Sequence, residues 1–153
     1  MVSTPDNFAN MVLTCPPYGD IEKYESAVGQ LSDIKQYDDF CKRIQVCGDN
    51  IERVLVPGGF CVWVCGDWRR GGEYKPFHSD CINMFTKSGL ILHDIIVMKN
   101  DTIFAALQAG KCASKRYTAK VHEYILVFRK KGELVSNSDK IKNREESLEQ
   151  FFS

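Results

Sequence analysis

The stretch Ala9-Asn10-Met11-Val12-Leu13-Thr14-Cys15-Pro16-Pro17-Tyr18 decides the fold of this chain. Residues 9–14 form a short apolar run, which predicts a strand, and two prolines follow directly after Cys15. Proline cannot donate to the ladder of a central strand, so the strand gives way to an irregular loop. Because each proline also fixes its φ angle, this loop is a rigid corner, and Tyr18 lies just beyond it.

Predicted helices and strands alternate outward from this corner. Apolar residues recur near a 3.6-residue period from Tyr37 to Val56, which predicts a helix that Pro57-Gly58-Gly59 ends. The apolar run Phe60–Cys65 predicts a strand covered on both faces, closed by Gly66-Asp67. Three further elements are expected: a helix over 78–88 that Gly89 ends, and strands over 90–98 and 121–128.

This alternation predicts an α/β fold, with a mostly parallel sheet of about four strands and an antiparallel last strand. Ligands of such sheets bind beyond the carboxyl ends of the strands. Two loops leave predicted strands at these ends, Cys15-Pro16-Pro17-Tyr18 and Gly66-Asp67-Trp68-Arg69. We therefore expect the chemistry of the chain in these two loops.

The composition is that of one globular domain. The chain has 153 residues, of which 44% are hydrophobic and 26% charged, and disorder and coiled coil are excluded. No apolar run approaches the ~20 residues that span a bilayer, and no export signal is recognisable, so a cytoplasmic protein without a membrane anchor is expected. The seven cysteines are odd in number and lack a Cys-x-x-Cys pair, which indicates reduced thiols and no metal site.

Positive charge is concentrated in the middle of the chain. Lys and Arg total 20, and Asp and Glu also total 20, so the formal net charge is zero. Residues 68–131 nevertheless hold 12 basic and 5 acidic side chains, a net charge of +7. Within them, residues 111–120 carry Lys111, Lys115, Arg116 and Lys120 and no acid. This segment is expected to be a basic loop, suited either to a nucleic-acid backbone or to an ordinary solvated surface.

The diproline corner has features that methylation of a nucleobase amine requires. The exocyclic amine of adenine or cytosine is a poor nucleophile because its lone pair is delocalised into the ring. Methylating it requires acceptors that hold both N–H bonds, together with an aromatic side chain that stacks on a base taken out of the duplex. A stiff loop carbonyl beside Tyr18 provides such an acceptor and such a ring. An ordinary Pro-Pro turn is the alternative.

The wider pattern resembles the amino-group DNA methyltransferases, which make N6-methyladenine or N4-methylcytosine. Residues 10–18 resemble the catalytic motif of that family. Four later blocks resemble its later motifs in the family's order: 54–59, 60–70, 88–100 and 122–130. The resemblance covers about residues 7–131 and implies part of a Rossmann-like methyltransferase fold.

The resemblance also implies roles for individual residues. The main-chain carbonyl of Pro16 accepts one amine hydrogen, the side chain of Cys15 accepts the other, and Tyr18 stacks on the base. Asp67, Trp68 and Arg69 border the same cleft. Lys111, Lys115 and Arg116 are expected near the DNA backbone. His78, His93 and His122 are interpreted as structural.

Two features depart from the family. Its usual residue at position 15 is Asp, Asn or Ser, and a thiol is a weaker acceptor than any of their oxygens. The family binds S-adenosylmethionine at a Gly-rich turn, whereas this sequence has no Gly-x-Gly. Residues 1–131 are therefore interpreted as a catalytic half without the cofactor-binding half, followed by a polar tail over 132–153. The first strand then exposes an edge open to a complementary half, a subunit or a second copy.

Three functions are compatible with these sequence features. The first is a DNA amino-methyltransferase that uses S-adenosylmethionine and needs a cofactor-binding half. The second is a noncatalytic DNA-binding or regulatory subunit derived from such an enzyme, which the Cys15 substitution favours. The third is related amine chemistry on RNA or on a protein glutamine, ranked last because the blocks after Gly59 resemble the DNA enzymes.

Overall fold

The computed structural model describes residues 4–17, 30–99, 110 and 112–133. The elements, in chain order, are β1 (Ala9–Thr14), η1 (Leu31–Asp33), α1 (Tyr37–Val54), β2 (Leu55–Cys65), β3 (Trp68–Arg70), β4 (Glu73–Lys75), α2 (Phe77–Lys87), β5 (Ile91–Lys99) and β6 (His122–Arg129). The predicted helices and strands are all present. Three elements that were not predicted, η1, β3 and β4, are added to them.

Four strands form one mixed sheet in the order β1-β2-β6-β5. Strand β1 pairs parallel with β2, while β6 pairs antiparallel with both β2 and β5. Strands β1, β2 and β5 therefore share one direction, and only the last strand in the chain, β6, runs against it. The predicted α/β class is confirmed, including its four strands and its antiparallel last strand.

Strand β2 begins earlier than predicted. Helix α1 ends at Val54 and β2 starts at Leu55, so Pro57-Gly58-Gly59 lies inside the strand and does not end the helix. The β1 register jumps here: Ala9 pairs with Leu55, but Met11 pairs with Phe60. Glycine is required in this irregular stretch, because a Cβ at Gly59 would lie 2.9 Å from Val56 O and 3.0 Å from Asn10 O.

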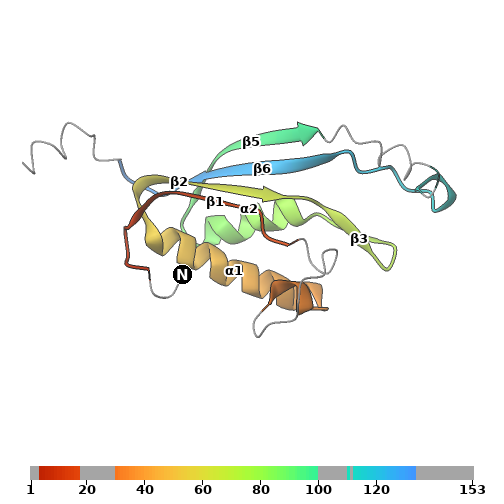
Figure 1. Cartoon of the computed structure of the whole chain (residues 1–153), viewed down its shortest axis with the longest axis horizontal. Helices are drawn as coiled ribbons and strands as arrows, with labels where there is room; N and C mark the ends of the chain where they lie inside the picture. The colour runs from red at the N-terminus through yellow and green to blue at the C-terminus, as the bar shows by residue number, and fades with distance from the viewer. Residues whose placement is uncertain (1–3, 18–29, 100–109, 111, 134–153) are drawn as a thin grey trace, which may run out of the picture.

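Both long helices pack on the same face of the sheet (Figure 1). The core between them and the strands is apolar and aromatic, and Trp63, Phe85 and Phe128 lie at its centre with ring centroids 4.7 Å and 5.0 Å apart. The helices approach closely at Gly48 of α1, where a Cβ would lie 2.8 Å from Phe85 Cδ1. Gly48 thus sets the distance between α1 and α2.

The opposite face of the sheet has no helix over it among the described residues. Along β2, Cys61, Trp63 and Cys65 are buried, whereas Phe60, Val62 and Val64 are only half-buried. Among the described residues both helices cover the same side of Phe60–Cys65, so the predicted cover on both faces is not confirmed. Met11 and Leu13 of β1 pair with Phe60 and Val62 and are 60% and 65% exposed.

Gly48→Val tests the helix contact. A branched side chain at Gly48 meets Phe85, which is fully buried and held by Trp63 and Phe128, so overpacking is expected to cost about 2 kcal/mol or more of unfolding free energy. Arg43→Val, at an exposed position of the same helix, controls for the helix propensity of valine and is expected to cost less than about 1 kcal/mol. Urea denaturation measures both, and equal losses would contradict the close approach.

Candidate functional site

The diproline corner leaves the sheet at the carboxyl edge shared by β1 and β2. Thr14, the last residue of β1, pairs in parallel register with Trp63, and β2 ends two residues later at Cys65. The corner and the Gly66-Asp67 loop therefore leave the same edge, as the sequence predicted. Cys15 is exposed, Pro16 is buried and Pro17 is half-buried. Tyr18 lies outside the described residues.

Asp67 is the buried centre of this edge. Only 2% of Asp67 is exposed, and it is the only buried charged residue within the described part of the chain. Tyr74 of β4 donates its hydroxyl to Oδ2 at 2.5 Å, and the backbone N–H of His78 donates to Oδ1 at 3.0 Å. His78 Nδ1 also lies 2.8 Å from each carboxylate oxygen. One carboxylate thus joins the end of β2 to β4 and to the first turn of α2.

These contacts set the charge state of the Asp67 carboxyl. Burial by itself raises its pKa, but the hydrogen bonds from the His78 backbone, the Tyr74 hydroxyl and the His78 ring outweigh burial and hold the pKa below its ordinary value. For the phenol the two effects add: burial and the bond donated to Asp67 raise the pKa of Tyr74 to about 12. Asp67 is therefore an ionised acceptor at neutral pH, and Tyr74 a protonated donor.

The three histidines that we interpreted as structural from the sequence make side-chain contacts to aromatic residues. The His78 ring stacks on Tyr124 of β6 with centroids 4.0 Å apart and an interplanar angle of 17°. His122 Nε2 lies 3.1 Å from the Tyr124 hydroxyl. His93 contacts Phe60 edge to face at 5.3 Å. The first two extend the Asp67 network to the start of β6.

Trp68 lies in the core. Its ring is 7% exposed and makes edge contacts with Tyr37, Phe40 and Phe77 at 5.6, 5.9 and 5.2 Å. The sequence had placed Trp68 at the border of a cleft, but the side chain is enclosed by α1 and α2. Its observed role is to fix the first residue of β3 to the helical layer.

Arg69 lies at the surface and joins two segments. Its guanidinium carbon is 5.1 Å from the ring centroid of Tyr74 and 4.6 Å from that of Tyr117. It therefore lies in cation–π contact with β4 on one side and with the basic segment on the other. Lys115 and Arg116 are exposed in that segment, and Arg116 has a left-handed φ of 57°. Lys111 lies outside the described residues.

Lys120 brings the basic segment to the end of β2. A Cβ at Gly66 would lie 2.1 Å from Lys120 Nζ, so the ammonium group lies directly against the Gly66 backbone, beside Asp67. The sequence analysis singled out Gly66 as a strand stop and as part of the Gly66-Asp67-Trp68-Arg69 loop, but not as a partner of Lys120. No spacing in the sequence indicates this contact, because it joins residues 54 positions apart.

Besides the contact of Lys120 with Gly66, two features of this edge were not predicted from the sequence, the β3–β4 hairpin and the pairing of Asp67 with His78. The hairpin had a recognisable signal, since Gly71-Gly72 separates two three-residue strands and both glycines have positive φ, 59° and 89°. The Asp67–His78 pair had none. Across the described residues, no cluster of three His, Cys, Asp or Glu side chains could hold a metal ion, and no helix is long and apolar enough to cross a bilayer.

The model of one protein family, described as DNA methylase (N6_N4_Mtase), matches residues 9–151. The chain belongs to this DNA methylase family. The match includes the diproline corner, the Asp67 network and the basic segment. It confirms the resemblance to the amino-group DNA methyltransferases that the sequence motifs indicated.

Similarity to known proteins supports the assignment of the chain to this family. The type II methyltransferase M.MthZI of Methanothermobacter thermautotrophicus is 25% identical over 145 residues, covering 83% of this chain and 41% of the relative. TTHA0409 of Thermus thermophilus, a provisionally assigned DNA modification methylase, superposes with a TM-score of 0.64 and 26% identity, covering 99% of this chain and 59% of TTHA0409. A further structure of TTHA0409 is complexed with S-adenosyl-L-methionine, at a TM-score of 0.63 and 27% identity.

A more distant structure shares the fold alone. The PvuII DNA methyltransferase, which is cytosine-N4-specific, has a TM-score of 0.63 at 17% identity, covering 84% of this chain and 44% of that enzyme. The chain therefore spans about two fifths of the length of M.MthZI and about three fifths of that of TTHA0409.

Asp67→Asn tests the buried carboxylate. The change leaves the donors of Tyr74 and His78 without a charged acceptor, and it is expected to lower the unfolding free energy at pH 7 by about 3 kcal/mol. The native pKa of Asp67 is depressed, so its contribution is complete above the unfolded value of about 3.9 and is lost as the pH falls through the lower native value. The difference between the two proteins should therefore shrink below about pH 4.

Urea denaturation at pH 7, 5 and 3 measures this difference. Asp39→Asn is the matched control, because Asp39 pairs with Lys42 at the surface, where an exposed ion pair contributes little to stability. A loss for Asp67→Asn that is the same at pH 3 and pH 7 would contradict an ionised buried carboxylate.

Proposed function

We propose that this chain is the catalytic portion of a site-specific DNA methyltransferase, which transfers a methyl group from S-adenosylmethionine to the exocyclic amine of adenine (N6) or cytosine (N4). The diproline corner carries the proposal. It lies at the shared carboxyl edge of two parallel strands, where such sheets bind ligands, and within the residues that match the DNA methylase family.

In this proposal, the corner holds the reacting amine. The carbonyl of Pro16 accepts one amine hydrogen, the Cys15 thiol accepts the other, Pro17 keeps the loop stiff, and Tyr18 stacks on the extruded base. The burial of Pro16 supports a fixed carbonyl, and the exposure of Cys15 leaves its side chain accessible to a substrate. Two acceptors on one amine draw the nitrogen toward tetrahedral geometry. The lone pair is then less delocalised into the ring and can attack the methyl group.

The surface around the corner supports DNA as the substrate. Arg69, Lys115 and Arg116 present positive charge beside the same edge, and Lys111 belongs to the same basic segment. Asp67 acts as a support in this proposal, because its carboxylate is buried and occupied by protein donors. Trp68 is left out, because its ring is enclosed by the core.

The described residues do not fit a complete cofactor site. The loops that follow β1 and β2 carry Cys15-Pro16-Pro17 and Gly66-Asp67, and the sequence has no Gly-x-Gly turn for the close approach of backbone to a cofactor. We therefore assign most of the S-adenosylmethionine contacts to a complementary half or subunit. Strand β1 pairs only with β2 in the described part of the chain and offers its other edge to that partner, or to a second copy.

A noncatalytic subunit is the second candidate function. Cys15 favours it, because a thiol accepts a hydrogen bond from the amine less well than the oxygen of Asp, Asn or Ser. Such a subunit would keep the basic surface and the partner edge and would bind DNA without methylating it. The two candidates differ in methyl transfer once the partner is supplied.

Calorimetry tests the division between two halves. The chain alone is expected to bind S-adenosylmethionine weakly or not at all, because it lacks the glycine turn. Titration of the purified chain, with TTHA0409 as a positive control, measures the affinity. Micromolar binding by the chain alone would contradict the proposed division.

Substitutions at the corner test the enzyme directly. In a complex that supplies the cofactor-binding half, Pro16→Ala and Tyr18→Ala should lower the methylation rate. Cys15→Asp should preserve that rate or raise it, with a gain on the order of 10²-fold at most. Rates are followed with radiolabelled S-adenosylmethionine, and nucleoside mass spectrometry identifies the methylated base. Val46→Ala, on the exposed face of α1, is the control.

The same assay separates the two candidates. A Tyr18→Ala rate equal to that of the wild-type chain would overturn the stacking role. DNA binding with no methylation, even after Cys15→Asp, would favour the noncatalytic subunit.

A further inference from the structure

The β3–β4 hairpin extends beyond the end of the main sheet (Figure 1). Its strands pair Trp68 with Lys75 and Arg70 with Glu73, and Gly71-Gly72 makes the two-residue turn. Both glycines are left-handed, as a type I′ turn requires. A Cβ at Gly71 would have no atom within 4 Å, so Gly71 presents bare backbone, whereas the Gly72 carbonyl accepts from Arg69 Nη1 at 3.5 Å.

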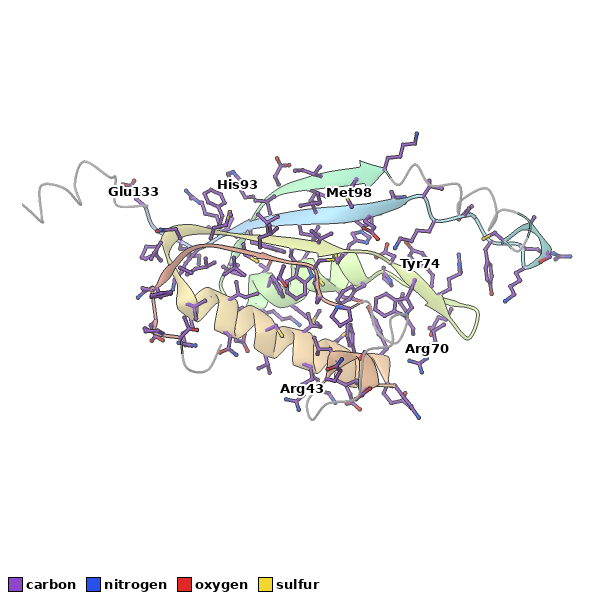
Figure 2. The ribbon with its side chains drawn as sticks, viewed as in Figure 1. Arg43, Arg70, Tyr74, His93, Met98 and Glu133 are labelled. Carbon is purple, nitrogen blue, oxygen red and sulfur yellow. The ribbon has the colours of Figure 1, made fainter. Side chains whose placement is uncertain are left out.

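The base of the hairpin is held in place. Trp68 packs in the core against Tyr37, Phe40 and Phe77, and Tyr74 bonds to the buried Asp67 carboxylate. Figure 2 shows Tyr74 and Arg70 on this hairpin. A ribbon this short is not stable in isolation, so these contacts at its base are what keep it extended.

The hairpin and the basic segment form one positive surface. Residues 68–75 carry three basic side chains and one acid, Glu73, which forms an ion pair with Lys75. Arg69 joins the hairpin to Tyr117, and a Cβ at Gly72 would lie 3.8 Å from the Tyr117 hydroxyl. The described segment 112–120 adds Lys115, Arg116 and Lys120 without an acid. A bare tip is thus flanked by cations.

We propose that the β3–β4 hairpin enters the major groove of duplex DNA tip first, while the basic segment 112–120 contacts the adjoining phosphates. The major groove of B-DNA is about 12 Å wide and admits a two-stranded ribbon. A Gly-Gly tip lets backbone approach the bases closely, and the flanking cations offset the charge of both strands. This inference rests on the proposed function and names the element that holds the duplex beside the diproline corner.

A charge at the tip tests the inference. Gly71→Asp suits a type I′ turn, because Asp tolerates left-handed φ, and places one negative charge where the open tip would meet DNA. Fluorescence anisotropy with a labelled 20-base-pair duplex should give a Kd about five- to tenfold higher than for the wild-type chain. The salt dependence of the Kd should become weaker.

Two matched variants isolate the cause. Gly71→Asn adds nearly the same atoms without charge, and its affinity should exceed that of Gly71→Asp by about fivefold. Asn7→Asp makes the same change of charge in another left-handed residue, with φ 51°, which precedes the start of β1 and so lies at the opposite end of that strand from the diproline corner. Its affinity should match that of the wild-type chain. Circular dichroism confirms that all variants fold.

The outcomes separate this inference from the proposed function. Duplex binding by the wild-type chain that Gly71→Asp leaves unchanged, or equal affinity for the single strand, would overturn groove insertion alone. A wild-type chain that binds no duplex would overturn both groove insertion and the DNA-binding part of the proposed function.

Discussion

The Asp67 carboxylate is the constraint on which the functional edge depends. A carboxylate with 2% exposure costs several kcal/mol unless donors surround it. The chain has to bring these donors from β4 and from the first turn of α2, since β2 ends just before Asp67. Satisfying one buried charge therefore fixes the hairpin and the helix relative to the sheet. His78 extends the constraint to β6 through its stacking on Tyr124.

The one-sided helical layer explains the burial pattern of the strands. Both α1 and α2 lie on one face, so alternate residues of β2 are buried and those between them are half-buried. In α/β proteins, a sheet of mostly codirectional strands is normally covered on both faces. The apolar side chains of Met11 and Leu13 at the β1 edge, and of Ile96 on β5, form an exposed face consistent with a further layer.

Local patterns in the sequence predicted the main elements of the fold. These patterns depend on residues close together in the sequence: the 3.6-residue spacing of apolar residues in α1, Gly89 at the end of α2, and the apolar runs of the strands. The two prolines of the corner likewise indicate where β1 ends. The predicted end of the first helix was wrong at Pro57-Gly58-Gly59, because glycines occur where the pairing register of a strand shifts as well as where a helix ends. The pairing of Asp67 with His78 and the burial of Trp68 depend on contacts between separate elements. A sequence pattern carries no signal for such contacts, although Gly71-Gly72 did carry one for the hairpin.

The structure separates the parts that would hold DNA from the part that would methylate it. The hairpin and the basic segment depend on Asp67, Trp68 and the Arg69 stacking, none of which involves Cys15. The corner owes its stiffness to two prolines and to the burial of Pro16, whereas Cys15 beside them is exposed. In the proposed function, Cys15 would supply one hydrogen bond to the amine, and the two prolines would keep the corner stiff whichever acceptor stands at position 15. On this proposal, the same scaffold would serve either an enzyme or a DNA-binding subunit, and the acceptor at position 15 would decide between them.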